Sequence, residues 1–395
     1  MKILLVAFSY PPIINAQSIR WSYFTNIWQK FGIKMDIISP FYISIKGRIN
    51  SEIFPFRMFL KRRSELFKEK KLLTKLLKQF AIKRILNIIE FLLLGEIFWD
   101  WNLYLKKVLC EIDLSTYQAI IISSEPHVST CLPAIWIKHN NIILDIGDPP
   151  ISNYFLGIPI FQRFHDFLFI RALRNSAKVV TTSLNTKFHL IEKFDVSEKK
   201  VKVIYQGFPA VLLKQCNKDT IILRTPIKLG YAGNFIRGIR EPKELIKGLK
   251  PFKEKIKLFY IGKEDEWTKQ FSKSLGNSFI FLGRKTHSET LEFLQTMDVL
   301  VYLGNKNDYQ TPGKFFEYLG LTKPILLIYQ NQKDESLKIS KAFNIPAFIS
   351  YNSHHLISKS IYKLVNSRKL IMRPNYIDKF SWETQSLKYI NFILS

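Results

Sequence analysis

The sequence predicts an α/β protein built from two Rossmann-like domains that face each other across a cleft. The first observation behind this prediction is the length, because 395 residues exceed what one hydrophobic core usually supports. The second is the composition: with 47% hydrophobic and 23% charged residues the chain is globular, which excludes a disordered, collagen-like or low-complexity protein. The third is the alternation of short apolar runs with amphipathic stretches, which is typical of parallel sheets with crossover helices.

The apolar runs give the expected strands in order. In the first half they are Ile3–Phe8, Asp36–Ser39, Ala119–Ser123, Ile142–Asp145, Val179–Ser183 and Val201–Tyr205. In the second half they are Lys228–Ala232, Ile256–Ile261, Phe279–Leu282, Val299–Leu303 and Pro324–Ile328. The pattern restarts after Gly207, so we place the hinge there. The first domain then covers residues 1–207, completed by a C-terminal helix at about 379–395, and the second covers residues 208–378.

Two apolar stretches could be taken for targeting or membrane segments. The run Ile3–Phe8 is short for a signal peptide, and Pro11-Pro12 follows it rather than a small-residue cleavage site. The stretch Phe80–Trp101 is interrupted by charged residues, whereas a spanning helix needs about 20 mostly apolar residues. We therefore expect a cytoplasmic protein that is soluble or peripheral to a membrane.

The chain is strongly basic, with 59 Lys and Arg against 32 Asp and Glu and a formal net charge of +27. Between Arg57 and Asn87 there are eleven basic and only two acidic residues, with leucines at roughly helical spacing between them. One interpretation is an amphipathic helix on an anionic membrane surface, such as the inner face of the plasma membrane. The other is a solvated helix face. No recognised nucleic-acid module is present and the arginines do not cluster on one helix, so we expect no nucleic-acid partner. A nucleic-acid-binding protein is kept as an alternative function only because the chain is so basic.

Several cofactor and metal sites are not supported by the sequence. The three cysteines (Cys110, Cys131, Cys216) lie far apart, which argues against a disulfide scaffold or a zinc site. The loop after the first strand has no glycine, so the dinucleotide fingerprint is missing there. The stretch 283–286 lacks the upstream glycine of a phosphate-binding Walker loop, and no metal-binding motif is found. We expect neither a bound cofactor nor a metal.

The residues from Tyr309 to Pro324 form the strongest candidate site. Thr311 suits a helix N-cap and Pro312 the first helical position, and free N–H groups at such a helix start can hold a phosphate. Gly313 would let a ligand approach the backbone, and Lys314 would add a positive charge. Glu317, one turn along on the same face, could accept hydrogen bonds from ribose hydroxyls. The alternative is an ordinary capped helix with a surface Lys–Glu pair.

This block, Pro312-x-Lys314-x-x-Glu317-Tyr318-Leu319, resembles the donor-site signature of family 4-type retaining glycosyltransferases, which have the GT-B fold. Further segments resemble that family in the same order, and they cover most of the chain: Tyr10-Pro11-Pro12 with Arg20-Trp21, residues 145–150, 172–181, 229–235, 281–284 and 297–300. The resemblance implies a metal-independent hexosyltransferase that takes a nucleotide-diphospho-sugar, most simply UDP- or GDP-linked, as a co-substrate. It also implies a glycan or lipid-linked acceptor, bound by the first domain, and a place in bacterial surface polysaccharide synthesis such as lipopolysaccharide or capsule.

The resemblance also assigns residues to the donor side. The family's basic pair on the donor phosphates falls in the loop after Gly233, where Arg240 matches one member and Asn234 replaces the other. Arg237 or Lys314 could substitute for the missing charge. Glu317 matches the family's ribose-binding glutamate, whereas Tyr309 stands where a partner glutamate is usual. Arg240, Lys314 and the amides near Gly313 would stabilise the departing diphosphate. The full set of donor-side candidates is Gly233, Asn234, Arg237, Arg240, Arg284, Gly313, Lys314 and Glu317.

On the acceptor side the correspondence is looser. Ser124 stands where many members have a histidine, and the nearby His127 could take that catalytic place or be an ordinary loop residue. The acceptor-side candidates are Asn15, Arg20, Ser124, Glu125 and Asp148. The replacements at Tyr309, Ser124 and Asn234 leave open a non-catalytic GT-B scaffold as the alternative function.

The end of the chain is predicted to be a helix capped by Ser381, with an apolar stripe at Leu387, Ile390 and Ile393. In GT-B enzymes a terminal helix of this kind crosses back onto the first domain. The alternative is a surface helix of the second domain.

Overall fold

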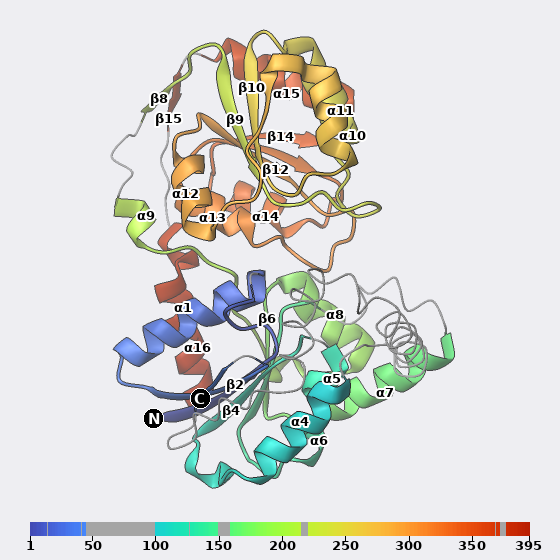
Figure 1. Cartoon of the computed structure of the whole chain (residues 1–395), viewed down its shortest axis with the longest axis vertical. Helices are drawn as coiled ribbons and strands as arrows, with labels where there is room; N and C mark the ends of the chain where they lie inside the picture. Colours follow the sequence, from blue (N-terminus) through green and yellow to red (C-terminus); the bar gives the residue numbers. More distant parts are fainter. Residues whose placement is uncertain are drawn as a thin grey trace, which may run out of the picture. The chain divides into compact units, whose positions relative to one another are not determined.

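The computed structural model describes residues 1–13, 15–40, 42–44, 99–125, 127–148, 159–214, 220–367, 369–371 and 377–395. The chain divides into two compact units, Met1–Ile204 together with Ser386–Ser395, and Tyr205–Gln385 (Figure 1). The basic segment from Arg57 to Arg84 lies outside the described residues, so both interpretations of it stay open.

The first unit contains a seven-stranded sheet in the order β3-β2-β1-β4-β5-β6-β7. Its strands are β1 Lys2–Ala7, β2 Lys34–Ser39, β3 Tyr42–Ser44, β4 Ala119–Ser123, β5 Ile142–Ile146, β6 Lys178–Thr181 and β7 Val201–Val203. Neighbouring strands are parallel except β2 and β3. Every residue of β4 and β5 is buried, as expected for parallel strands with helices on both faces. The strand order reverses between β1 and β4, where doubly wound sheets bind their ligands.

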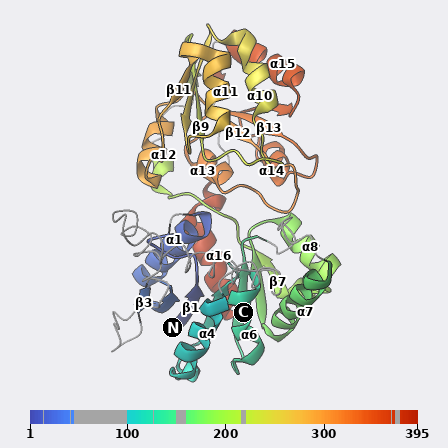
Figure 2. The same cartoon turned by 45° about the vertical axis from the view of Figure 1, so that its right-hand side comes forward.

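Helices cover both faces of this sheet (Figures 1 and 2). They are α1 Ala16–Lys30, α4 Trp99–Cys110, α5 His127–Cys131, α6 Pro133–Trp136, α7 Pro159–Asn175, α8 Leu184–Phe194 and α16 Trp382–Leu394. On one face, Trp101 of α4, Phe169 of α7 and Leu190 of α8 are buried in a single core cluster with residues of the sheet. On the other face lie α1 and α16.

The C-terminal helix α16 follows Ser381, whose Oγ accepts a hydrogen bond from the Thr384 N–H at 3.1 Å. Residues 386–395 belong to the first unit, which confirms the predicted return of this helix to the first domain. The predicted apolar stripe was partly wrong, because Leu387 is 49% exposed. The helix packs instead through buried Tyr389, whose ring lies 5.4–6.1 Å from the rings of Trp21, Phe24 and Trp28 of α1.

The second unit contains a six-stranded sheet in the order β11-β10-β9-β12-β13-β14, and every pair in it is parallel. The strands are β9 Ile227–Ala232, β10 Ile256–Ile261, β11 Phe279–Phe281, β12 Val299–Leu303, β13 Ile325–Tyr329 and β14 Ala347–Tyr351. A separate antiparallel pair joins β8 Thr220–Ile222 to β15 Lys369–Ile371. The order of the main sheet reverses between β9 and β12.

The helices of the second unit are α9 Val211–Lys214, α10 Lys243–Leu249, α11 Glu266–Leu275, α12 His287–Gln295, α13 Lys314–Gly320, α14 Glu335–Ala342 and α15 His354–Asn366. On one face of the sheet, Leu245 of α10 and Ile357 of α15 share a core cluster. On the other face, Phe315 of α13 and Ile339 of α14 belong to a second cluster. Among the described residues, no helix has both the length and the apolar character needed to cross a bilayer.

The structure confirms the α/β architecture of two Rossmann-like domains. All the predicted strands are present, with ends within two residues of the predicted ones. Four strands were not predicted: β3, β8 and β15, which have only three residues each, and β14. Strand β14 lies at the edge of its sheet and is only partly buried, so it lacks the continuous apolar run that marks the central strands.

Candidate active site

Two loops meet at the C-terminal edge of the second sheet, where the strand order reverses. One follows β9 and the other follows β12, and the second leads into α13. Most of the predicted donor-side residues lie on these segments: Gly233, Asn234, Arg237 and Arg240 on the first loop, and Gly313, Lys314 and Glu317 at the start of α13. Ligands of doubly wound sheets bind at this edge, and the predicted residues lie along it.

Lys314 is held against the end of β9. Its Nζ donates hydrogen bonds to the Tyr231 hydroxyl at 2.8 Å and to the Ala232 carbonyl at 3.2 Å. Gly233, with φ of +113°, permits this approach, because a Cβ there would lie 3.2 Å from Nζ. Burial and then the positive charge of Arg240 lower the pKa of Lys314 well below its usual value, while Glu317 opposes the shift. A bound anion would relieve this unfavourable environment.

Arg240 is the second cation of the site. Its Nε donates a hydrogen bond to Oδ1 of the buried Asn305 at 3.1 Å, which joins the two loops across the point of reversal. The main chain supports this position, because the Arg240 N–H donates to the Ile236 carbonyl at 2.7 Å. The charge of Arg240 acts on both Lys314 and Tyr231. Two cations close enough for one to lower the pKa of the other suit a ligand with two adjacent negative charges, such as a diphosphate.

Glu317 faces a histidine that the sequence did not point to. Nε2 of His287, at the start of α12, lies 2.8 Å from Oε1 of Glu317. Burial alone would lower the pKa of His287, but the hydrogen bond and the negative charge of Glu317 raise it overall. Both side chains are partly exposed, at 24% and 19%, so the pair can still be reached by a ligand.

The start of α13 differs from the prediction. The helix begins at Lys314 with Gly313 as its cap, two residues later than expected, and no side chain caps it. Thr311 is buried, and its hydroxyl donates a hydrogen bond to Oε2 of Glu335 at 3.3 Å instead of capping the helix. The helix has only seven residues, so we assign the electrostatics of the site to its side chains rather than to the helix terminus.

Other predicted donor-side residues lie farther out on the surface. Asn234 is exposed and accepts a hydrogen bond from the Lys263 N–H at 3.2 Å, which ties the loops after β9 and β10 together. Arg237 and Arg284 are exposed. Within the described part of the chain, neither arginine is hydrogen-bonded to Lys314 or Glu317.

In the first unit, several acceptor-side candidates gather where the strand order reverses. Nδ2 of Asn15 donates hydrogen bonds to the Ser9 hydroxyl at 2.9 Å and to Oε1 of Glu125 at 3.4 Å. Burial raises the pKa of Glu125, and Ser9 partly offsets this. Burial, together with the charge of Glu125, raises the pKa of Asp148 to about 7. Ser124 is buried, and its hydroxyl has no hydrogen-bond partner among the described residues.

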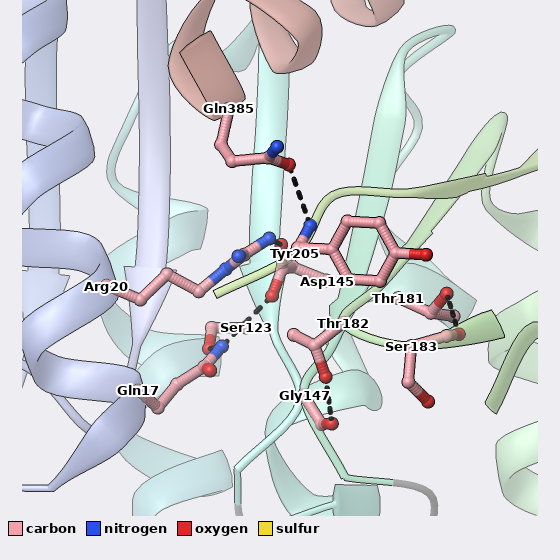
Figure 3. Close-up of polar contacts among 10 residues, drawn as sticks. All are labelled: Gln17, Arg20, Ser123, Asp145, Gly147, Thr181, Thr182, Ser183, Tyr205 and Gln385. Carbon is pink, nitrogen blue, oxygen red and sulfur yellow. Dashed lines mark hydrogen bonds and ion pairs between the residues drawn. The ribbon is translucent and has the colours of Figure 1, made fainter. Parts of the chain in front are cut away.

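Arg20 does not belong to this group, which corrects its predicted placement on the acceptor side. It is fully buried, and its guanidinium pairs with Oδ2 of Asp145 at 3.1 Å (Figure 3). Gln17 completes the network by donating to Oδ1 of Asp145 and to the Ser123 hydroxyl, both at 3.0 Å. Because the guanidinium is buried and paired with Asp145 inside the core, it is not available to an acceptor, and its removal would leave the Asp145 carboxylate buried without its partner.

His127 is the first residue of α5, directly after the Glu125 loop, but its side chain lies outside the described part of the structure. Its predicted role therefore stays a prediction.

Four residues of the donor side were missed by the sequence reasoning: Tyr231, His287, Asn305 and Glu335. The capping pattern Thr286-x-x-Glu289 signals the start of α12 and thus the position of His287. Nothing in the sequence signals the partners of the other three. Among the residues that the structure describes, no group of three or more His, Cys, Asp or Glu side chains could hold a metal ion.

The sequence matches no protein-family model. It is also not significantly similar to any curated protein.

The fold has clear matches among solved structures. The Anabaena protein Alr3699/HepE in complex with UDP and glucose has a TM-score of 0.58, with 12% identity over 100% of both chains. The lipopolysaccharide outer core galactosyltransferase WaaB has a TM-score of 0.53, with 13% identity over 100% of this chain and 99% of WaaB. A glycosyltransferase from Rickettsia africae has a TM-score of 0.52, with 14% identity over 99% and 97% of the two chains. These full-length matches confirm the predicted GT-B fold, and at such low identity they establish the fold alone.

Proposed function

We propose that this protein is a glycosyltransferase that transfers a sugar from a nucleotide-diphospho-sugar to a glycan or lipid-linked acceptor. The observation that carries the proposal is that two cations, Lys314 and Arg240, lie at the point of strand reversal, close enough for the charge of Arg240 to lower the pKa of Lys314. Glu317 follows one helical turn after Lys314. The ligands named for the HepE structures, UDP with glucose in one and UDP-glucose in another, support the same class of donor.

In this proposal the two cations bind the diphosphate of the donor. Negative charge builds up on the leaving diphosphate in the transition state, and fixed positive groups stabilise it without a divalent metal. Binding the anion also stabilises the charged form of Lys314, which the ligand-free site disfavours. Glu317, oriented by His287, accepts hydrogen bonds from the ribose hydroxyls. The reaction retains the anomeric configuration through a front-face displacement, in which the leaving phosphate takes the proton of the acceptor hydroxyl.

The acceptor is bound by the first unit. Asn15, Glu125 and Asp148 present polar groups at the reversal point of its sheet, and these groups can bind sugar hydroxyls. We also propose that the protein acts in surface polysaccharide synthesis and is located in the cytoplasm. There the basic segment Arg57–Arg84 would attach it to the inner face of the membrane. WaaB, named for the outer core of lipopolysaccharide, is consistent with that class of acceptor.

A non-catalytic GT-B scaffold is the rival function, because Tyr309, Ser124 and Asn234 replace residues typical of active enzymes. A thermal-shift panel of UDP-, GDP-, dTDP- and CMP-sugars separates the two, since a ligand that binds only the native state raises the Tm. The proposal predicts a rise with one nucleotide class, followed by turnover of that donor. No shift with any donor contradicts the proposal, and a shift without turnover favours the scaffold.

A further inference from the structure

Side-chain amides form hydrogen bonds along the C-terminal edge of the second sheet. Gln330 is the first residue after β13, and Asn352 is the first residue after the neighbouring strand β14. Nδ2 of Asn352 donates a hydrogen bond to Oε1 of Gln330 at 3.0 Å. This bond orients the Gln330 amide, because its oxygen faces Asn352 and its NH₂ group is left for other acceptors.

The NH₂ group of Gln330 binds the two loops that carry the donor site. Nε2 donates one hydrogen bond to the carbonyl of Gly304, the first residue after β12, at 2.6 Å. It donates another to the carbonyl of Ile239, in the loop after β9, at 3.1 Å. The two acceptors lie 26 and 91 residues from Gln330 in the sequence, so one amide group joins three separate segments. We call these two hydrogen bonds the Gln330 bridge.

The bridge lies directly beside the hydrogen bond that orients Arg240. Ile239 precedes Arg240 in the sequence, and Gly304 precedes Asn305. Nε of Arg240 donates to Oδ1 of Asn305 at 3.1 Å, as described above. The Gln330 amide therefore holds the main chain at both ends of this contact, next to the cation on one loop and next to its acceptor on the other.

We propose that Gln330 is a positioning residue that sets where the guanidinium of Arg240 lies during catalysis. The inference rests on the proposed function, in which Arg240 stabilises the leaving diphosphate. Such stabilisation depends on charges that are fixed before the reaction, and a shift of about 1 Å in a positioned group can cost about 10²-fold in rate. Arg240 lies between β9 and α10, outside any helix or strand, so its position depends on the contacts of this loop.

The kinetic test is a double-mutant cycle on the full chain, with release of the nucleoside diphosphate from the donor that raises the Tm as the readout. Gln330→Met keeps the length of the side chain but removes the amide. We expect kcat to fall about tenfold while the donor KM changes by less than about threefold, because Arg240 acts mainly in the transition state. In the Arg240→Ala background the same substitution should change kcat by less than about twofold.

The matched control is Gln270→Met, which makes the same change at an exposed position on α11 and should leave kcat unchanged. Two kinetic results would overturn the proposal. One is a kcat of Gln330→Met within about twofold of wild type. The other is an equal fold loss with and without Arg240, since the amide would then act independently of that cation.

Asn352→Ala provides a second variant where Gln330→Met does not fold. It removes only the hydrogen bond that orients the amide. We expect a smaller fall in kcat, which again disappears in the Arg240→Ala background. An unchanged kcat in Asn352→Ala would then count against the proposal.

Hydrogen–deuterium exchange of the ligand-free protein tests the bridge without turnover. In Gln330→Met, exchange should become faster in the loops after β9 and β12, where the N–H groups of Arg240 and Lys306 donate to main-chain carbonyls. Exchange in β10 should stay at the wild-type rate, and unchanged exchange in both loops would overturn the proposal. Absence of wild-type turnover with every donor would contradict the proposed function, whereas the exchange result would still decide whether the bridge holds the loops.

Discussion

Lys314 carries a charge that the proposed donor site uses, at a buried position that disfavours the charge in the ligand-free protein. Its lowered pKa means that, between that pKa and its usual value, the unfolded chain binds more protons than the native protein does. The stability of the ligand-free protein therefore rises with pH across this window, and below it the buried charge is destabilising. If the proposed role is correct, function and stability oppose each other at this residue.

We predict that Lys314→Met raises the Tm of the ligand-free protein by a few degrees at neutral pH and removes the donor-induced shift. The substitution keeps the length of the side chain but removes the charge that burial disfavours. Differential scanning fluorimetry with and without the stabilising donor measures both effects. Lys338→Met, at an exposed position on α14, should change neither. A variant that is less stable and still binds the donor would contradict this view of Lys314.

The raised pKa of Asp148 gives the stability of the protein a pH dependence opposite in sign to that from Lys314. Its pKa is raised to about 7 in the folded protein, so the native state binds more protons than the unfolded chain between about pH 4 and 7. Its contribution to stability is present below that window and is lost as the pH rises through 7. We expect the Tm of the wild type to fall between pH 5 and 8 by more than that of Asp148→Asn.

The control for this titration is Glu254→Gln, whose side chain is 87% exposed in the second unit. It should keep the wild-type pH profile. Parallel profiles for wild type and Asp148→Asn would show that the first-unit carboxyl group titrates normally.

At the level of elements, helices α10 and α15 depend on a glycine at their contact. A Cβ at Gly248 would lie 2.6 Å from Cγ2 of Ile357 and 3.2 Å from the His354 carbonyl, which is closer than side chains tolerate. We predict that Gly248→Ala destabilises the protein by about 1–3 kcal/mol, although alanine is the better helix former. Urea denaturation measures the change. Lys247→Ala, exposed on the same helix, should cost far less, and a stabilised Gly248→Ala would refute the packing argument.

The elements also show what the sequence could and could not predict. Central strands such as β4 were predictable because they are buried on both faces and read as continuous apolar runs. The start of α13 was not, because the buried carboxylate of Glu335 takes the Thr311 hydroxyl that local preference would use as a cap. Here a tertiary contact overrides a local propensity.

Contacts between residues far apart in the sequence also explain which partners in the site were not predicted and why Arg20 was misplaced. Arg240 and Lys314 could be proposed from the sequence because they lie within segments that resemble family motifs. The partners Asn305 and His287 are 65 and 30 residues away from Arg240 and Glu317, so only the fold brings each pair together. Arg20 was misplaced because its partner Asp145, 125 residues away, buries it in the core.

At the scale of the whole molecule, the charge of +27 predicts binding to anionic membranes. Each exposed Lys or Arg near an anionic leaflet contributes about 1 kcal/mol, and salt screens this attraction. We predict that the protein cosediments with anionic but not zwitterionic vesicles, less at high salt. Changing Lys70, Lys71, Lys75 and Lys78 together to Glu should abolish this binding.

The matched control for the membrane test changes four exposed lysines of the second unit to Glu: Lys253, Lys255, Lys269 and Lys273. It makes the same change in net charge but should keep most of the binding. Equal losses in both variants would show that total charge, and not the segment Arg57–Arg84, governs the attraction.

In the proposed mechanism, Arg240 and Lys314 at the reversal point of the second sheet stabilise the leaving diphosphate of a nucleotide-sugar. The decisive measurement is the release of the nucleoside diphosphate in EDTA, with the donor that raises the Tm, for wild type, Arg240→Ala and the exposed control Lys338→Ala. We predict undiminished turnover for wild type and control, and a fall in kcat on the order of 10²-fold for Arg240→Ala. Turnover of Arg240→Ala within about twofold of wild type, or loss of wild-type turnover in EDTA that Mg²⁺ restores, would contradict it.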